Sequence, residues 1–283
     1  MQTILVPFDF SEEAENAFNF AQQLASKTGG KLKLVHIVEM PTTQSFSTMG
    51  EMNLDSAQLN QVYMIELVEK RKRQLQEIEE LHQNKPYQFK TKIAFGNPYA
   101  GISTEITDIK ADLVIMGSKG SSGLEELLIG SNTEKVVRHA KCPVITVKQP
   151  IHADQIKKII FASDFSEDNR IVIQHIKALQ ELLGAELSLV KINTPNFFET
   201  SKDSRLKIEE FITAHGLSNT HAVIYNSTSE EEGIIEYAEE TKADMIALAT
   251  HGRTGFMHLL SGSIAEDVVN HAMRPVWTMK ITK

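Results

Sequence analysis

The chain has 283 residues, of which 41% are hydrophobic and 23% are charged, and its formal net charge is −8. This composition is typical of a folded protein with room for two domains, and the negative charge argues against nucleic-acid binding. No apolar run approaches the roughly 18 residues of a membrane span, and we expect no signal peptide. The single cysteine, Cys142, cannot form an internal disulfide, so we expect a cytoplasmic protein.

The first half alternates between strand and helix patterns. An apolar run over residues 4–6 precedes a helical pattern that Gly29 and Gly30 end. The elements expected after that helix are strands over residues 32–37, 88–95, 113–116 and 144–147, and helices over about 56–83, 99–110 and 131–140. This order predicts a parallel sheet covered on both faces, with ligands bound where its strands end.

The second half repeats the first. ILVPFDFSEEAENAF from Ile4 aligns with IIFASDFSEDNRIVI from Ile159, and KADLVIMGSKG aligns with KADMIALATHG. IGSNTEKVVRHAKCPVITVK then aligns with SGSIAEDVVNHAMRPVWTMK without a gap. We therefore predict two tandem α/β domains, residues 1–148 and 157–283, joined by a linker over 149–156, each a doubly wound parallel sheet of about five strands.

A glycine-rich segment follows the predicted strand 113–116. It reads Gly117-Ser118-Lys119-Gly120, and Gly130-Ser131-Asn132-Thr133 precedes the next helix. Glycines let backbone N–H groups approach a ligand closely, and a helix N-terminus adds free donors and a positive dipole. The segment is thus a candidate phosphate-binding loop, and the alternative is a simple turn between strand and helix.

The spacing Gly117-x2-Gly120-x9-Gly130-Ser131 resembles the nucleotide loop of the universal stress protein family. The resemblance extends to VPFDFS at 6–11, VHI at 35–37, GNP at 96–98 and KCPV at 141–144. It covers nearly all of residues 1–148 and, through the repeat, 157–280, so the chain resembles a tandem member. The resemblance implies a Rossmann-like, adenine-nucleotide α-hydrolase-like fold and a role in the stress response.

The resemblance also implies ATP, or ADP or AMP, as the ligand of the first domain. The glycine loop would hold the phosphates, Asp9 would face the ribose hydroxyls, and Ile37 would offer its backbone to the adenine edge. For Asp9 the alternative is a helix cap. The implied binding residues are Pro7, Phe8, Asp9, Ile37, Gly117, Lys119, Gly120, Gly130, Ser131 and Asn132.

The second copy departs further from this pattern. Ala249 stands where the first copy has Gly117, and an alanine adds a Cβ where the backbone needs close approach or a positive φ. We therefore expect the second domain to bind nucleotide weakly or not at all. Its candidate residues are Asp164, Ile192, Gly252, Gly262, Ser263 and Ile264.

The function expected from these features is regulatory nucleotide binding, and no catalytic residue is predicted. A GxxxxGK[ST] motif is absent, so fast ATP hydrolysis is not expected. The alternatives are a slow ATPase and an interaction module that binds no nucleotide. The spacing of His251, His258 and His271 matches no common zinc pattern, so we predict no metal site, although Mg²⁺ could accompany ATP through its phosphates.

The resemblance further implies that two such domains pair through their last strands. Here these are residues 144–147 and 275–279, so we expect a pseudo-dimer within the chain, with no exposed edge there and with Trp277 partly buried. Dimerisation of whole chains stays open, and protein partners are unknown. Residues 70–73, a run of four basic side chains, are expected on a solvated helix face, and Cys142 is expected to be buried and inert. Residues 41–55 have no assigned role, and a flap over the pocket is one hypothesis.

Overall fold

The computed structural model describes residues 1–39, 54–119, 129–165, 170–251 and 262–281. The first half contains β1 (Thr3–Pro7), α1 (Glu12–Thr28), β2 (Lys31–Val38), α2 (Leu54–Leu81), β3 (Gln88–Phe95), α3 (Pro98–Asp108), β4 (Leu113–Gly117), α4 (Ser131–His139) and β5 (Val144–Val147). The second contains β6 (Lys158–Ala162), α5 (Arg170–Leu183), β7 (Glu186–Asn193), α6 (Ser201–His215), β8 (Thr220–Asn226), α7 (Glu230–Glu240), β9 (Met245–His251), α8 (Gly262–His271) and β10 (Val276–Ile281).

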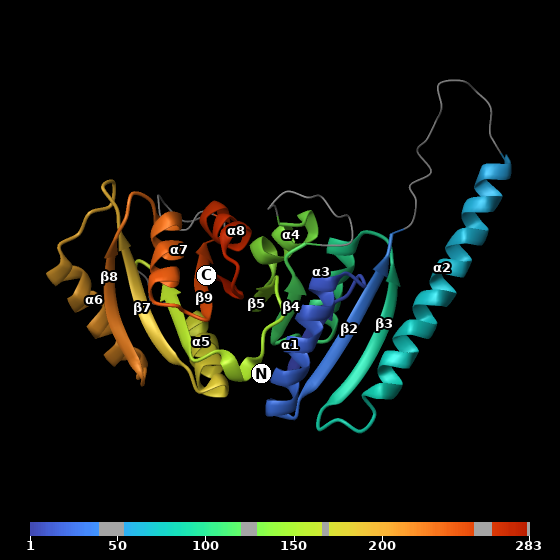
Figure 1. Ribbon diagram of the computed structural model, residues 1–283, viewed down its shortest axis with the longest axis horizontal. Coiled ribbons are helices and arrows are strands. Elements are labelled where there is room, and N and C mark those ends of the chain that lie inside the picture. The colour runs from blue at the N-terminus through green and yellow to red at the C-terminus, as the bar shows by residue number, and fades with distance from the viewer. Residues whose placement is uncertain (40–53, 120–128, 166–169, 252–261, 282–283) are drawn as a thin grey trace, which may run out of the picture.

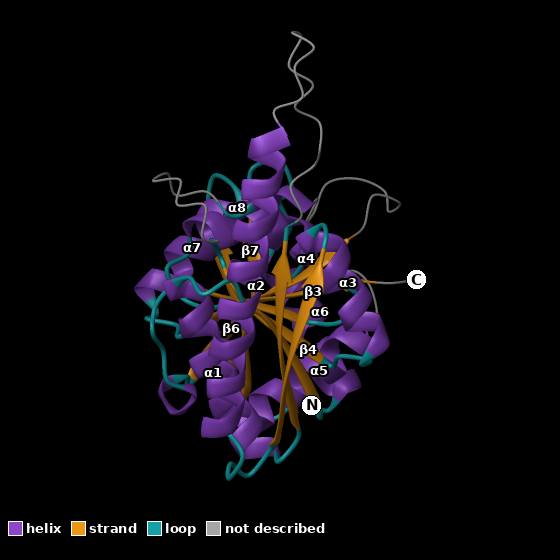
Figure 2. Cartoon of the chain, turned by 90° about the vertical axis from the view of Figure 1, so that its right-hand side faces the viewer, coloured by secondary structure: helices purple, strands orange, loops and turns teal. Residues whose placement is uncertain are grey.

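In the described residues the strands form one continuous sheet, in the order β3-β2-β1-β4-β5-β10-β9-β6-β7-β8 (Figure 1). Neighbouring strands run parallel in each half, and the halves meet where β5 and β10 pair antiparallel. Helices cover both faces of the sheet (Figure 2), so central strands such as β4 are buried along their whole length. The predicted class, two doubly wound α/β domains, is confirmed.

Capping residues set the ends of the helices that border the cavity described below. The Ser11 side chain caps α1 by accepting a hydrogen bond from the Ala14 N–H at 3.2 Å, and Asn97 caps α3 from Ala100 at 3.0 Å. Helix α1 ends at Thr28, and its C-cap is Gly29, which adopts a left-handed φ of 65°. Predicted and observed elements differ by one or two residues, as for α2, which begins at residue 54 and not 56.

The seam between the halves corrects one expectation. Trp277 lies on β10 opposite Ile145 of β5, and its side chain is completely buried, not partly buried as predicted. Its indole Nε1 has no hydrogen-bond partner in the described residues. The paired strands satisfy each other's backbone groups, so neither half presents β5 or β10 as an open edge.

The segment 149–156 packs against the first half. It contains a short 3-10 helix, Ala153–Gln155, whose Ala153 is fully buried. The Ala153 N–H donates to Gln23 Oε1 at 2.8 Å, and Asp154 pairs with Lys27 at 2.7 Å, so two contacts fix this segment to α1. Among the described residues no helix is both long and apolar enough to cross a membrane.

Candidate functional site

A cavity of about 450 Å³ opens where β1, β2 and β4 end, and the start of α4 closes one side of it. Its wall brings together sequence segments that are more than a hundred residues apart. Nine of the ten residues predicted for the first site line it: Pro7, Phe8, Asp9, Ile37, Gly117, Lys119, Gly130, Ser131 and Asn132. The tenth, Gly120, lies outside the described residues.

Asp9 sits in a tight turn after β1. One oxygen of its carboxylate accepts hydrogen bonds from the Ser11 N–H at 3.0 Å and the Ser11 hydroxyl at 2.6 Å. The turn places Phe10 at a left-handed φ of 66°, which is rare for a bulky residue and is usually held by surrounding contacts. The cap of α1 is Ser11, so the carboxylate of Asp9 supports the turn and lines the cavity without capping the helix itself.

His36 and Ile37, near the end of β2, form part of the cavity wall. The imidazole Nδ1 of His36 lies 2.7 Å from the Phe8 carbonyl, and burial lowers the pKa of His36, which keeps the ring neutral near pH 7. The Ile37 side chain reaches α3 at Gly101, where a Cβ would come within 2.7 Å of Ile37 Cδ1. Glycine at 101 therefore makes room for the apolar side chain that lines the cavity.

Arg71 corrects the expectation that residues 70–73 form only a solvated face. Its neighbours Lys70, Lys72 and Arg73 are exposed, but Arg71 is half-buried and lines the cavity. Its guanidinium lies 4.1 Å from the centre of the Phe10 ring, a cation–π contact. One cation of this basic run therefore faces the site.

The loop after β4 is held by several polar contacts. Thr133 donates its hydroxyl to the Gly117 carbonyl at 3.0 Å, and the Gly130 N–H donates to the Ser118 carbonyl at 2.8 Å. Glu13, in the first turn of α1, accepts from the Ser118 hydroxyl at 2.7 Å and from the Lys119 N–H at 2.5 Å. The described parts of the loop are thus tied to each other and to α1.

Gly117 lies against α1 more closely than any side chain allows. A Cβ at Gly117 would lie 2.9 Å from Glu13 Cβ, 3.0 Å from the Glu13 carbonyl carbon and 3.1 Å from the Ala14 nitrogen. Its φ is not in the left-handed range. Of the two reasons given for a glycine at this position, close approach is therefore the one that applies.

The start of α4 is the part of the wall best suited to an anion. Its N-cap is Gly130, which has no side chain to cap the helix. The first backbone N–H groups of a helix have no partner within it, and the dipole makes this end positive. Ser131 and Asn132 at this position line the cavity, so the geometry fits a phosphate group.

The second half has its own cavity of about 350 Å³ at the ends of β6 and β7. Two of its predicted residues, Asp164 and Ile192, line this cavity, and Ala249 is buried nearby in β9. Ile264 is packed on the apolar core of this half and is not among the cavity's described residues. Gly252 lies outside the described residues; Gly262 and Ser263 are the first two residues of α8, and the position of the Ser263 side chain is not described.

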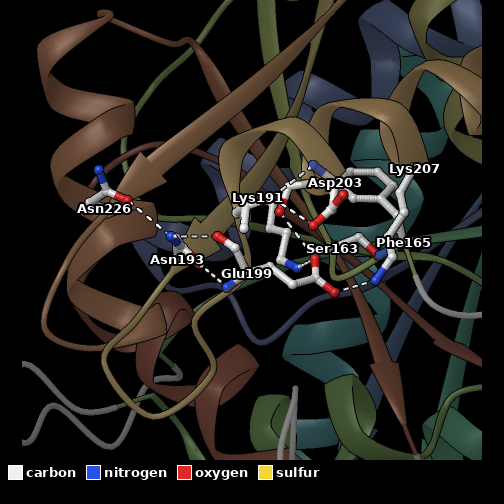
Figure 3. A network of polar contacts seen from close by, with 10 residues as sticks. Ser163, Phe165, Lys191, Asn193, Glu199, Asp203, Lys207 and Asn226 are labelled. Carbon is white, nitrogen blue, oxygen red and sulfur yellow. Dashed lines mark hydrogen bonds and ion pairs between the residues drawn. The ribbon is translucent and has the colours of Figure 1, made fainter.

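An ion network lies along the wall of this second cavity (Figure 3). Glu199 pairs with Lys191 of β7 and Lys207 of α6, and it accepts a hydrogen bond from the buried Ser204 hydroxyl at 3.0 Å. These contacts, above all those from the two lysines, lower the pKa of Glu199 to about 2. Lys191 occupies the repeat position of His36, so the two halves differ at this wall.

The remaining candidates do not form a further site in the described residues. No group of three or more His, Cys, Asp or Glu side chains is placed there to hold a metal ion. His271 contacts Glu231 at 2.6 Å on the surface, whereas His258 lies outside the described residues, as does the side chain of His251. Cys142 is buried, which raises its pKa to about 12 and keeps the thiol protonated.

Sequence reasoning missed three residues that shape these walls: Arg71, Glu13 and Gly101. Only Gly101 carried a signal, because the repeat places Gly233 at the matching position of α7, where a Cβ would come within 2.6 Å of Ile192 Cγ2. Nothing in the basic run singled out Arg71, since its orientation depends on how α2 packs against Phe10. Glu13 contacts Ser118 and Lys119, which lie 105 and 106 positions further along the chain, so no local pattern indicates this contact.

The fold and the paired cavities define a class of protein, one with two tandem Rossmann-like α/β units in a single chain. A model of the universal stress protein family matches residues 1–148 and 155–280. The chain therefore belongs to the universal stress protein family, and it carries two copies of the family's domain.

Individual relatives agree with this assignment. The universal stress protein Slr1230 of Synechocystis is 23% identical over 303 aligned positions, covering 99% of this chain and all of that protein. SSP1056 of Staphylococcus saprophyticus is 31% identical over 52% of this chain and 83% of its own length. A crystal structure of a universal stress protein from Archaeoglobus fulgidus shares the fold, with a TM-score of 0.74, 19% identity and coverage of 99% of this chain and 98% of that one.

Proposed function

We propose that this chain is a cytoplasmic regulatory protein of the stress response that binds ATP, or ADP or AMP, in its first domain, residues 1–148. The observation that carries the proposal is the cavity of about 450 Å³ at the ends of β1, β2 and β4. Such a volume is within the usual range of small-molecule sites. Its wall combines an apolar side, a carboxylate and the start of a helix, which are the features that an adenine ring, a ribose and a phosphate require.

Each part of a nucleotide has a matching part of the wall. Ile37 offers an apolar surface and adjacent backbone groups to the base, and Asp9 offers carboxylate oxygens to the ribose hydroxyls. The N-terminus of α4 offers free N–H groups to the phosphates, with Lys119 on the same wall. Phosphate oxygens and water would hold an accompanying Mg²⁺ ion, which needs few protein ligands. With no Walker lysine in the sequence, we expect little hydrolysis.

The test combines a search for bound ligand with one charge substitution. Nucleotide released from the purified, denatured chain is identified by mass spectrometry, and ATP affinity is measured by calorimetry. Ser131→Glu adds a carboxylate at the start of α4, and we expect ATP to bind at least about tenfold more weakly because two anions would compete for one end of the helix.

Ser131→Gln is the matched control, with the same shape and no charge, and it should retain most of the affinity. A glutamate in the first helical turn favours the helix, so the melting temperature of Ser131→Glu should not fall. Equal ATP affinity in Ser131→Glu and Ser131→Gln would contradict the proposed site.

A further inference from the structure

The seam between the two halves reaches the wall of the first cavity. Helix α8 of the second half lies beside α4 of the first (Figure 1), and Asn270 is in the last turn of α8. The side-chain oxygen Oδ1 of Asn270 accepts a hydrogen bond from the Ile129 backbone N–H at 2.5 Å. Ile129 directly precedes Gly130, which caps α4 at the proposed phosphate end of the cavity.

The start of α4 is held from both halves of the chain. From its own half come the contacts of Thr133 with the Gly117 carbonyl and of Gly130 with the Ser118 carbonyl. From the other half comes the Asn270 amide, which fixes the backbone one residue before the cap. The Ile129 side chain is half-buried and packs against the apolar cores of both halves, so this residue lies at the seam itself.

Further contacts keep α4 and α8 together. Arg138 of α4 makes two hydrogen bonds to Glu266 of α8, at 2.7 and 2.6 Å. Lys148, which follows β5, donates from Nζ to the Asn270 backbone carbonyl at 2.5 Å. Asn270 is therefore contacted through its side chain by the loop before α4 and through its backbone by the residue after β5.

The contact between Asn270 and Ile129 has no equivalent made by the matching residue of the first half. Asn270 stands at the position that Arg138 occupies in the first half, because VVRHA aligns with VVNHA. An arginine has only donors and cannot accept a hydrogen bond from a backbone N–H. The described ion pairs of Arg138 go instead to Glu134 and Glu266. Of these two repeat positions, only that of Asn270 therefore offers an amide acceptor, and this acceptor contacts the loop that borders the first cavity.

We infer that Asn270 is a positioning residue for the phosphate end of the first cavity, so that nucleotide binding in one half is coupled to the packing of α8 in the other. The inference rests on the proposed function. An ordered backbone at residues 129–133 lowers the cost of ordering that a ligand meets on binding. Coupling between two regions is reciprocal, so a nucleotide at α4 also stabilises the seam with α8.

The test compares Asn270→Leu, which removes the acceptor, with Asn270→Asp, which keeps one of the same shape. The first measurement is amide hydrogen exchange at residues 129–133 without nucleotide, followed by NMR. Loss of one hydrogen bond should make exchange at Ile129 about fivefold to tenfold faster in Asn270→Leu, and Asn270→Asp should restore slow exchange. The second measurement is ATP affinity, which should fall by a similar factor in Asn270→Leu.

Glu266→Gln is the matched control, because it weakens the contact with Arg138 on the same pair of helices but leaves Ile129 bonded. It should lower the melting temperature of the chain and leave exchange at Ile129 unchanged. Wild-type exchange and ATP affinity in a folded Asn270→Leu chain would overturn the inference. If the wild-type chain binds no ATP, the proposed function fails, and the exchange data alone decide whether Asn270 orders the loop.

Discussion

The two cavities occupy the same place in their halves but are lined by different charges. The first has the carboxylates of Asp9 and Glu39 and the cations of Arg71 and Lys119, and α4 adds a positive helix end. The second has three carboxylates, Asp164, Glu199 and Glu230, against two lysines, Lys191 and Lys207. The described wall of the second cavity therefore carries one more negative than positive side chain, which disfavours a polyanion such as ATP.

The features that both halves keep are those that support the fold. Phe10 and Phe165 share the same left-handed turn, with φ values of 66° and 56°. The cavity walls are kept only in part: Asp9 and Ile37 recur as Asp164 and Ile192, but His36 is replaced by Lys191. The two halves thus share the scaffold but differ in part of the cavity wall.

Among the residues that differ between the halves, Gly117 is the one whose substitution we expect to have the largest effect on stability and ATP binding. Gly117→Ala gives the first half the residue that the second has at Ala249, and the new Cβ would press on the backbone of α1. We expect a loss of about 2 kcal/mol in the free energy of unfolding, the usual cost of overpacking, and weaker ATP binding because the loop must shift. Urea unfolding and calorimetry measure the two effects.

The reverse change, Ala249→Gly, serves as the control. We expect it to leave ATP binding of the second half undetectable, because Lys191 and Glu199 still fill the matching wall. Strong ATP binding gained by this one substitution would show that the residue at this loop position alone determines whether a half binds ATP. It would contradict the role given to the charged side chains of the second cavity.

A smaller effect is expected in the second half at Glu199. Its pKa is lowered from 4.5 to about 2, chiefly by the hydrogen bonds from Lys191 and Lys207. Its stabilising contribution is complete above the ordinary value of 4.5 and is lost as the pH falls toward about 2. With allowance for solvent screening, Glu199→Gln should cost about 1 kcal/mol at pH 7. The cost should shrink as the pH is lowered through this range.

Urea unfolding of the wild type and Glu199→Gln across this pH range makes the measurement. The double variant Lys191→Met with Glu199→Gln removes the buried cation together with its partner, so we expect it to recover part of the lost stability. A cost that is the same at pH 7 and at low pH would assign the effect to packing and not to the ion pairs.

Local patterns in the sequence predicted the fold because each element is coded by nearby residues. Ser11 and Asn97 cap α1 and α3, Gly29 ends α1, and the apolar run of β4 is buried as expected. The resemblance to the universal stress protein family, applied to the internal repeat, predicted that the halves would pair through β5 and β10, and the structure confirms this pairing. The burial of Trp277 was underestimated because it depends on side chains from both halves.

The site was only partly predictable for the same reason. Nine predicted residues line one cavity, since the resemblance fixed their positions along the chain. Arg71 reaches that cavity through its packing on Phe10, and Asn270 reaches the loop from the other half, 141 positions from Ile129. Neither contact leaves a local pattern, because it exists only after distant segments have packed together.

The two halves share a fold, and we expect only the first to bind ATP, so the stoichiometry of ATP binding distinguishes one functional half from two. Calorimetric titration of the whole chain should give one site per chain, and Ser131→Glu in the first half should weaken that site. Two sites of equal affinity, or a single site unaffected by Ser131→Glu, would contradict the account.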